Sequence, residues 1–327
     1  MDYIPHHQMD GRPHLMIDGA AMPGTALTLS HWPKSGTPWP LKGDLSAEIV
    51  FNYLKQPAFR VDASAATNTH YDTDGLVGIW AALHPAQALE REPLLVEIAK
   101  AGDFGCFKDW DGWRVSCALS AYAEGPNSPL PGPVFEGSNA DRQGKLYQAL
   151  LPLLPEMMAA PGRFRPHWEE AEARLKEAEA LVRSGQAGLR EDQDLQLAVF
   201  DLPPGVEPAA FPQEALHNAT DCMALLVRSG ARSRFYYRYE TWVQFVSRPL
   251  RPRVDLRPLA ARLTELEAGR GEWATPEPEW IVPVLSLAGA EESRIPPALF
   301  ERMLKEALAA GAPAFDPFDA PGLDRAR

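Results

Sequence analysis

The densest run of side chains suited to chemistry is the segment 69–75, Thr-His-Tyr-Asp-Thr-Asp-Gly. His70, Asp72 and Asp74 alternate in it, so in an extended chain the three side chains point to the same side. One imidazole and two carboxylates form a mixed nitrogen and oxygen set that suits Mn²⁺, Mg²⁺ or Zn²⁺. The structural alternative is that Asp72 or Asp74 caps the helix expected at 76–83, with His70 a residue at a strand end. The segment is therefore a candidate metal site with a capping alternative.

A second candidate is the segment 29–38, Leu-Ser-His-Trp-Pro-Lys-Ser-Gly-Thr-Pro. His31 ends an expected strand, and a polar loop containing glycine follows it. If this strand and the strand before His70 are neighbours in one sheet, the two histidines approach each other at one edge. His31 would then be a metal ligand or a general acid near neutral pH. The alternative is a hydrogen-bonded histidine in a proline-rich loop. We predict catalytic roles for His31 and Asp74.

Arginines gather in the C-terminal part of an otherwise acidic chain, at positions 238, 248, 251 and 253. Guanidinium groups bind phosphate or carboxylate through two parallel hydrogen bonds. The alternative is a set of surface arginines paired with acidic side chains. His217 lies in a polar run before an expected strand, where a capped turn is the alternative to a binding role. We predict that Arg238, Arg248, Arg253 and His217 bind the substrate.

The first candidate needs elements that place it at the edge of a sheet. The apolar patterns predict strands over 14–19, 26–32 and 59–70, and helices beginning at Asp44 or Ser46 and over 76–83 and 86–101, the last divided at Pro93. Strands that alternate with helices in this way form an α/β unit with a buried sheet. Such sheets bind ligands beyond the carboxyl ends of their strands, which is where segment 69–75 would lie.

The remaining patterns predict a change of architecture after a Pro/Gly/Ser-rich stretch at 128–139. They indicate helices over 140–159, 167–184, 254–269 and 296–310, and strands over 195–202, 221–230 and 231–247, the last two joined by a hairpin at Ser229-Gly230. The predicted fold class is α/β in three parts. Residues 1–135 form a metal-binding domain with a mostly parallel sheet and flanking helices. Residues 136–190 form a helical linker or lid, and residues 191–327 form a smaller, substrate-binding α/β domain.

Composition narrows the class of protein. The chain has 327 residues, 45% of them hydrophobic, and a net charge of −12, values of a globular protein with more than one domain. The acidic balance argues against duplex nucleic acid as a partner. Three widely spaced cysteines fit neither a disulfide framework nor a zinc site. Without a secretory signal or a long apolar run, we expect a cytoplasmic protein that does not bind membranes. Motifs of P-loop enzymes, dinucleotide oxidoreductases, serine hydrolases and zincins are absent.

The segment 70–83, HYDTDGLVGIWAAL, resembles the first motif of the DHH phosphoesterase superfamily, in which a strand ends in a His/Asp-x-Asp-Gly pattern before an apolar helix. The resemblance implies two divalent ions, typically manganese, and hydrolysis of phosphoester or phosphoanhydride bonds. It implies that His70, Asp72 and Asp74 are metal ligands, and that Asp103 stands where the second aspartate motif of that superfamily falls.

The C-terminal part is similar to the domain associated with such enzymes. That domain has a strand bearing a serine and arginine pair and then a Val-Asp start to a helix, and Ser247-Arg248 and Val254-Asp255 fit this outline. The chain contains no Asp-His-His triplet and no Gly-Gly-Gly-His loop. The resemblance therefore implies either a divergent relative with an altered second metal site or convergence on the same phosphate-binding turn.

The leading hypothesis is a metal-dependent phosphohydrolase that uses Mn²⁺, or Mg²⁺ or Zn²⁺. It would act on a small anionic substrate that is phosphorylated or nucleotide-like. One alternative is a non-catalytic module that binds a nucleotide or a protein. Another is a metal-dependent hydrolase of a non-phosphate substrate. A homodimer is one oligomeric state that is compatible with the sequence.

Overall fold

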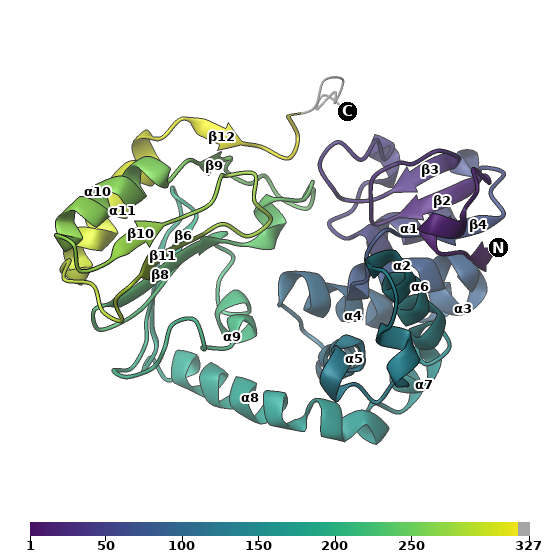
Figure 1. Cartoon of the computed structure of the whole chain (residues 1–327), viewed down its shortest axis with the longest axis horizontal. Helices are drawn as coiled ribbons and strands as arrows, with labels where there is room; N and C mark the ends of the chain where they lie inside the picture. Colours follow the sequence, from purple (N-terminus) through teal and green to yellow (C-terminus); the bar gives the residue numbers. More distant parts are fainter. Residues whose placement is uncertain (320–327) are drawn as a thin grey trace. The chain divides into compact units, whose positions relative to one another are not determined.

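A computed structural model describes residues 1–319, and the chain divides into two compact units (Figure 1). Unit 1 comprises Met1–Glu172 and Gln244–Arg248, and unit 2 comprises Ala173–Val243 and Pro249–Arg327. The boundary between them lies inside the segment 136–190, within helix α8 (Glu169–Arg183). The end of the predicted third domain, residues 320–327, lies outside the described residues.

Unit 1 is built on a four-stranded sheet whose neighbouring strands all run parallel, which confirms the predicted mostly parallel sheet. The strands are β1 (Asp2–Tyr3), β2 (His14–Ile17), β3 (Thr25–Leu29) and β4 (Ala65–Thr67), in the order β1-β4-β2-β3. The strands predicted before His31 and before His70 are therefore not neighbours, because β2 lies between them. All four residues of β2 are buried, as a central strand of a parallel sheet requires.

Helices of unit 1 begin and end at local sequence signals. They are α1 (Ser46–Lys55), α2 (Thr73–Leu83), α3 (Pro85–Glu90), α4 (Glu92–Phe104), α5 (Trp110–Ala123), α6 (Asn139–Leu150) and α7 (Leu154–Ala159). The predicted break near Pro93 is confirmed, since α3 and α4 are separated at Arg91. The single helix predicted over 140–159 is instead two helices, because Pro152 lacks an N–H and its ring obstructs the preceding turn. Among residues 1–319, no helix has the length and apolar character needed to cross a membrane.

Residues Gln244–Arg248, here called the return segment, pack on unit 1 although both flanking stretches belong to unit 2. The Gln244 N–H donates to the His31 carbonyl at 2.7 Å. The Asp44 carboxylate accepts the N–H groups of Val246 at 2.7 Å and Ser247 at 2.9 Å. The strand predicted over 231–247 was therefore too long: its regular part ends at Tyr237, and the return segment is held by contacts with unit 1 instead.

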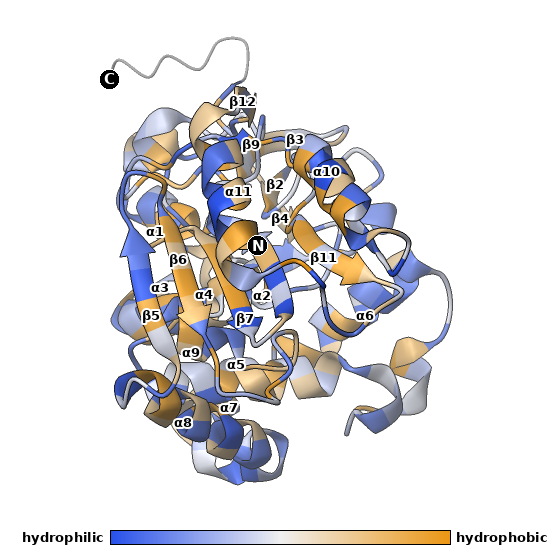
Figure 2. Cartoon of the chain, turned by 90° about the vertical axis from the view of Figure 1, so that its left-hand side faces the viewer, coloured by the Kyte–Doolittle hydropathy of each residue, from blue (hydrophilic) through white to orange (hydrophobic). Residues whose placement is uncertain are grey.

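Unit 2 contains a six-stranded mixed sheet, in the order β10-β11-β8-β7-β6-β5, and a small pair β12-β9. Its elements are β5 (Gly188–Asp192), β6 (Leu197–Asp201), α9 (Gln213–His217), β7 (Ala224–Ser229), β8 (Arg232–Tyr237), β9 (Arg253–Val254), α10 (Arg257–Glu267), β10 (Glu272–Ala274), β11 (Val284–Ala288), α11 (Pro297–Ala310) and β12 (Pro313–Phe315). The predicted hairpin is confirmed, because β7 and β8 pair antiparallel around Gly230, whose φ is +58°. Figure 2 shows an apolar β6 beside a polar edge strand β5, a pattern that protects a sheet edge.

The core of unit 2 lies between this sheet and two helices. Leu197, Leu226 and Phe235 of the strands share one buried cluster with Leu263 of α10 and Leu304 of α11. Alternate residues of β6, β7 and β8 supply the cluster, as expected when one face of a sheet packs on helices. Burial of this apolar face, at roughly 25 cal/mol per Å², is the main stabilising contribution to the unit.

Candidate metal centre

Six histidine and aspartate side chains meet at the carboxyl edge of the unit 1 sheet. The group is called the His/Asp cluster, and its members are Asp18, His31, His70, Asp72, Asp74 and Asp103. Four of them follow the ends of strands β2, β3 and β4, and the other two come from the first turn of α2 and the last turn of α4. Because parallel strands end at the same edge, residues far apart in sequence converge there. The structure thus brings all five predicted metal-ligating or catalytic residues together and adds Asp18.

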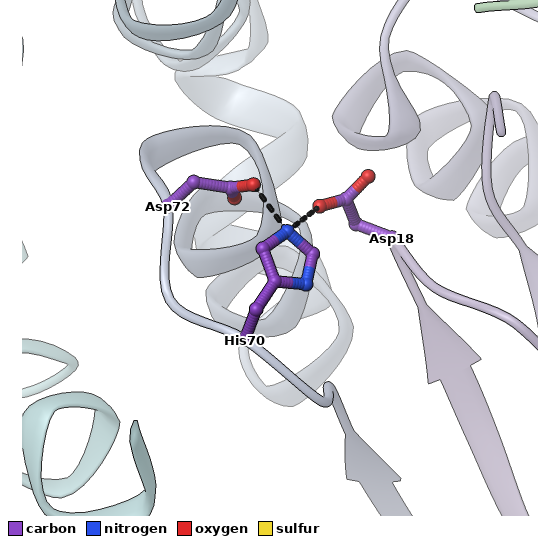
Figure 3. A group of neighbouring side chains, drawn as sticks. All are labelled: Asp18, His70 and Asp72. Atoms are coloured by element: carbon purple, nitrogen blue, oxygen red, sulfur yellow. Dashed lines mark hydrogen bonds and ion pairs between the residues drawn. The ribbon is translucent and has the colours of Figure 1, made fainter. Parts of the chain in front are cut away.

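One half of the cluster is centred on His70 (Figure 3). Its Nε2 atom lies 2.5 Å from Asp72 Oδ2 and 3.2 Å from Asp18 Oδ2, and the two carboxylates flank the ring. Ligand atoms of these three residues lie within 4.8 Å of one another, close enough to share one metal ion. The side chains of His70 and Asp72 are about one-third exposed, at 32% and 31%, so this half of the cluster is accessible to solvent.

The other half is centred on His31 and is buried. His31 Nε2 lies 3.4 Å from Asp18 Oδ1, 3.9 Å from Asp74 Oδ2 and 3.6 Å from Asp103 Oδ2. The opposite ring nitrogen, Nδ1, donates to the Asp44 carbonyl at 2.7 Å. A carbonyl only accepts, so Nδ1 carries a proton and Nε2 is the nitrogen available to a metal ion. Both predicted roles of His31, metal ligand and general acid, would use this Nε2 atom.

Asp18 is common to both halves and was not among the predicted site residues. Its Oδ1 atom faces His31 and its Oδ2 atom faces His70, so this one carboxylate contacts both histidines of the cluster. Asp18 has a φ of +52°, in the left-handed region that residues other than glycine seldom adopt. The sequence did carry a signal, since an Asp-Gly pair follows the apolar strand 14–17 just as Asp74-Gly75 follows segment 69–73.

Asp72 and Asp74 each accept hydrogen bonds from the first turn of a helix, but the two helices differ. Asp72 is the N-cap of α2, because its Oδ1 atom accepts the Gly75 N–H at 2.7 Å. Asp74 instead binds the start of α1: its Oδ2 accepts the Ser46 N–H at 2.7 Å and its Oδ1 accepts the Ala47 N–H at 2.8 Å. A carboxylate oxygen has more than one acceptor position, so these bonds orient both side chains and leave capacity for a cation.

Burial and the neighbouring charges together shift the pKa values of the cluster members. Burial raises the pKa of Asp74 to about 7, and the neighbouring charge of Asp18 acts in the same direction. Burial works to lower the pKa of His70, but Asp18 and Asp72 outweigh it and raise that pKa to about 11. Burial works to raise the pKa of Asp18, yet the imidazolium groups of His31 and His70 hold it well below its usual range. Negative charge in the cluster is thus offset in two ways, by the imidazolium groups beside Asp18 and by a raised pKa that favours the protonated form of Asp74.

Arg253 does not have the predicted substrate-binding role. Its side chain is fully buried in unit 2 and donates to Thr241 Oγ1 at 2.7 Å and to the carbonyls of Pro278 at 2.8 Å, Trp280 at 2.5 Å and Ile281 at 2.9 Å. These donations span the three guanidinium nitrogens. The prediction for Arg253 was wrong because the sequence pattern does not reveal backbone carbonyls as the partners of an arginine.

Arg238 and His217 are likewise buried parts of unit 2, at 3% and 8% exposure. The Arg238 guanidinium is paired with Glu240 and donates to the carbonyls of His217 and Thr220. The His217 ring lies 3.1 Å from the Tyr236 hydroxyl. Both side chains therefore organise the interior of unit 2, and the prediction that they bind substrate was wrong.

Arg248 differs from the other predicted substrate residues because it lies in the return segment and belongs to unit 1. Its guanidinium lies over the Phe245 ring, 5.9 Å from the ring centre. Phe245 contacts Phe104 with ring centres 5.8 Å apart, and Phe104 lies beside His31 at 6.2 Å. A continuous row of ring contacts therefore connects Arg248 to the His31 half of the cluster.

Fold and site together define an α/β protein whose parallel sheet carries a candidate divalent-cation centre at its carboxyl edge. The chain belongs to a family of unknown function, DUF6687, which matches residues 1–318. The match includes both units, so they are parts of one family architecture. No curated protein matches the chain.

Proposed function

We propose that this protein is a divalent-metal-dependent phosphohydrolase and that the His/Asp cluster is its metal centre. The observation that carries the proposal is the position of Asp18, whose two oxygens face two different histidines at the carboxyl edge of a parallel sheet. The resemblance of segment 70–83 to the first DHH phosphoesterase motif supports the same reaction class.

The residues of the cluster fit a divalent cation. Asp18 Oδ2 is buried and accepts no hydrogen bond from the residues that the structure describes, although it lies 3.2 Å from His70 Nε2. Four carboxylates and two imidazoles match the nitrogen and oxygen ligands of Mn²⁺, with Mg²⁺ or Zn²⁺ as alternatives. A divalent cation among these atoms would supply the positive charge that protonated imidazoles otherwise provide, and its binding would release protons.

The cluster offers two overlapping ligand sets. Asp18, His70 and Asp72 would hold one ion, and Asp18, His31 and Asp74 would hold the other, with Asp103 beside His31. Bound divalent ions supply Lewis acidity, which activates water and stabilises negative charge on a phosphoryl group. The protein fixes the ligands in advance: the Asp44 carbonyl orients His31, and the N-terminus of α1 orients Asp74.

The substrate class follows from charge. A metal centre rich in carboxylates attracts an anion only through its bound cations, and a guanidinium beside it adds a second anchor for phosphate. Arg248 is the predicted arginine that shares a unit with the cluster, so we assign it this anchoring role. The proposed substrate is a small phosphorylated or nucleotide-like molecule.

The direct test uses the full chain, stripped of metal with EDTA and then titrated with Mn²⁺ by calorimetry. We expect Mn²⁺ binding and hydrolysis of p-nitrophenyl phosphate or bis-(p-nitrophenyl) phosphate that appears with Mn²⁺ and disappears with EDTA. Absence of metal binding would overturn the proposal. Metal binding without hydrolysis of either ester would favour the non-catalytic alternative, and hydrolysis confined to carboxylic esters would favour the non-phosphate alternative.

Replacing Arg248 with alanine should raise KM for the phosphate ester about 10- to 100-fold, because a hydrogen bond to a charged group contributes about 1.5–3 kcal/mol. Mn²⁺ stoichiometry should not change, since Arg248 is not a ligand. Arg12→Ala, at an exposed arginine of the same unit, is the matched control and should leave KM as it is. An unchanged KM in Arg248→Ala would remove Arg248 from the proposed site.

A further inference from the structure

Ser46, the first residue of α1, is completely buried against the His/Asp cluster. Its hydroxyl donates to Asp18 Oδ1 at 2.7 Å and accepts the His31 N–H at 3.2 Å. Its own N–H donates to Asp74 Oδ2 at 2.7 Å. Ser46 therefore contacts each member of one of the two ligand sets, Asp18, His31 and Asp74.

The contacts of Ser46 are selective for that set. Within the part of the chain that the structure describes, no hydrogen bond joins Ser46 to His70 or Asp72. These two residues contact each other; His70 is also held by Asp18 and Asn68, and Asp72 by Gly75. A hydroxyl both donates and accepts, so it can fix the carboxylate of Asp18 and the backbone of His31 at the same time. An alanine at this position would keep the backbone contact with Asp74 and lose both hydroxyl contacts.

We propose that Ser46 is a positioning residue that builds the Asp18, His31 and Asp74 site and has little influence on the Asp18, His70 and Asp72 site. This inference rests on the proposed function, because it assumes that the cluster binds cations. The physical reason is that the donated hydrogen bond holds Oδ1 of Asp18 toward His31, while Oδ2 remains directed at His70. Hydrogen bonds of this kind behind metal ligands typically change metal affinity 10- to 100-fold.

The test compares the wild-type chain with Ser46→Ala by Mn²⁺ titration calorimetry and by electron paramagnetic resonance at increasing Mn²⁺. In wild type we expect two Mn²⁺ equivalents and, at saturation, the signal of a spin-coupled pair. In Ser46→Ala one equivalent should weaken about 10- to 100-fold. The other should keep its affinity, so an uncoupled single-ion signal persists to higher Mn²⁺ concentration. Ser46→Thr retains the hydroxyl and should restore the coupled signal.

Two further variants separate positioning from folding. Ser116→Ala removes a buried hydroxyl from α5 of the same unit and should bind Mn²⁺ like wild type. Ser46→Cys preserves the size of the side chain and has a weak donor, so it should show the same selective weakening if Ser46→Ala does not fold. Circular dichroism of the metal-free proteins establishes that the compared variants are folded.

The outcomes distinguish this inference from the proposed function. Two Mn²⁺ equivalents of unchanged affinity in Ser46→Ala would overturn the role of Ser46 and leave the metal centre standing. Equal weakening of both equivalents would also overturn it, because the claim is selective. No Mn²⁺ binding by the wild-type chain would overturn the proposed function and, with it, the inference.

Discussion

Asp18→Asn should lose both Mn²⁺ equivalents and, with them, the proposed hydrolysis. The expected loss is large because this carboxylate is the one shared by the two ligand sets, and an amide offers one neutral oxygen where two charged oxygens stood. Removing several kcal/mol of Lewis-acid stabilisation lowers the rate by about 10³-fold or more, since each 1.36 kcal/mol is tenfold. Metal content by elemental analysis and the rate with excess Mn²⁺ are the measurements.

Variants of three other aspartates test whether the loss of both Mn²⁺ equivalents is specific to Asp18. Asp72→Asn and Asp74→Asn should each lose one equivalent, because each residue belongs to one ligand set. Asp62→Asn, at an exposed aspartate of the same unit, should retain full metal content. If Asp72→Asn and Asp74→Asn both keep full metal content, the ligand assignment is wrong. If Asp18→Asn keeps it, Asp18 is not the bridging ligand.

Arg253→Met should destabilise unit 2 by several kcal/mol, because each buried acceptor left without its donor costs about 1–3 kcal/mol. Methionine fills much of the volume but donates no hydrogen bond, so the carbonyls of Pro278, Trp280 and Ile281 lose their buried donor. Arg253→Lys should recover only part of the loss, because an ammonium cannot reproduce the planar fork of a guanidinium. Urea unfolding followed by tryptophan fluorescence measures both variants.

Arg257→Met is the matched control for this prediction. Arg257 is half exposed and paired with Asp255 on the surface, so its replacement should leave the urea midpoint close to that of wild type, because exposed ion pairs contribute little to stability. Mn²⁺ binding by Arg253→Met should equal that of wild type, since Arg253 and the cluster belong to different units. A stable Arg253→Met chain with weakened phosphate binding would instead return Arg253 to the substrate-binding role that the structure denies it.

The residues of the site that lie close together in the chain could be identified from the sequence. His70, Asp72 and Asp74 lie within five residues, and the apolar helix after them is evident from composition alone. Asp103 and His31 were found by resemblance and by their place at an expected element end. The sequence indicates the positions of these residues at element ends because strand ends, helix starts and alternation depend on neighbours a few residues away.

The order of the strands in the unit 1 sheet could not be predicted from the sequence. The pattern indicates strands before His31 and His70 but not that β2 lies between them, and this order is what places Asp18 between the two histidines. Side-chain partners were equally hidden: an arginine that binds phosphate and one that binds buried carbonyls look the same in sequence, so Arg253 was misassigned.

By itself, then, the sequence determined the α/β class, the parallel sheet and the chemical types gathered after its strands, because these depend on short-range periodicity and on residue chemistry. The tertiary structure alone decided that Asp18 contacts both halves of the cluster, that Ser46 contacts one of them, and that the return segment packs on unit 1. The physical reason is distance along the chain. Asp18 and His70 are brought together by the burial of whole strands and helices. The free energy of this burial comes from contacts between elements distant in sequence, which a local pattern does not reveal.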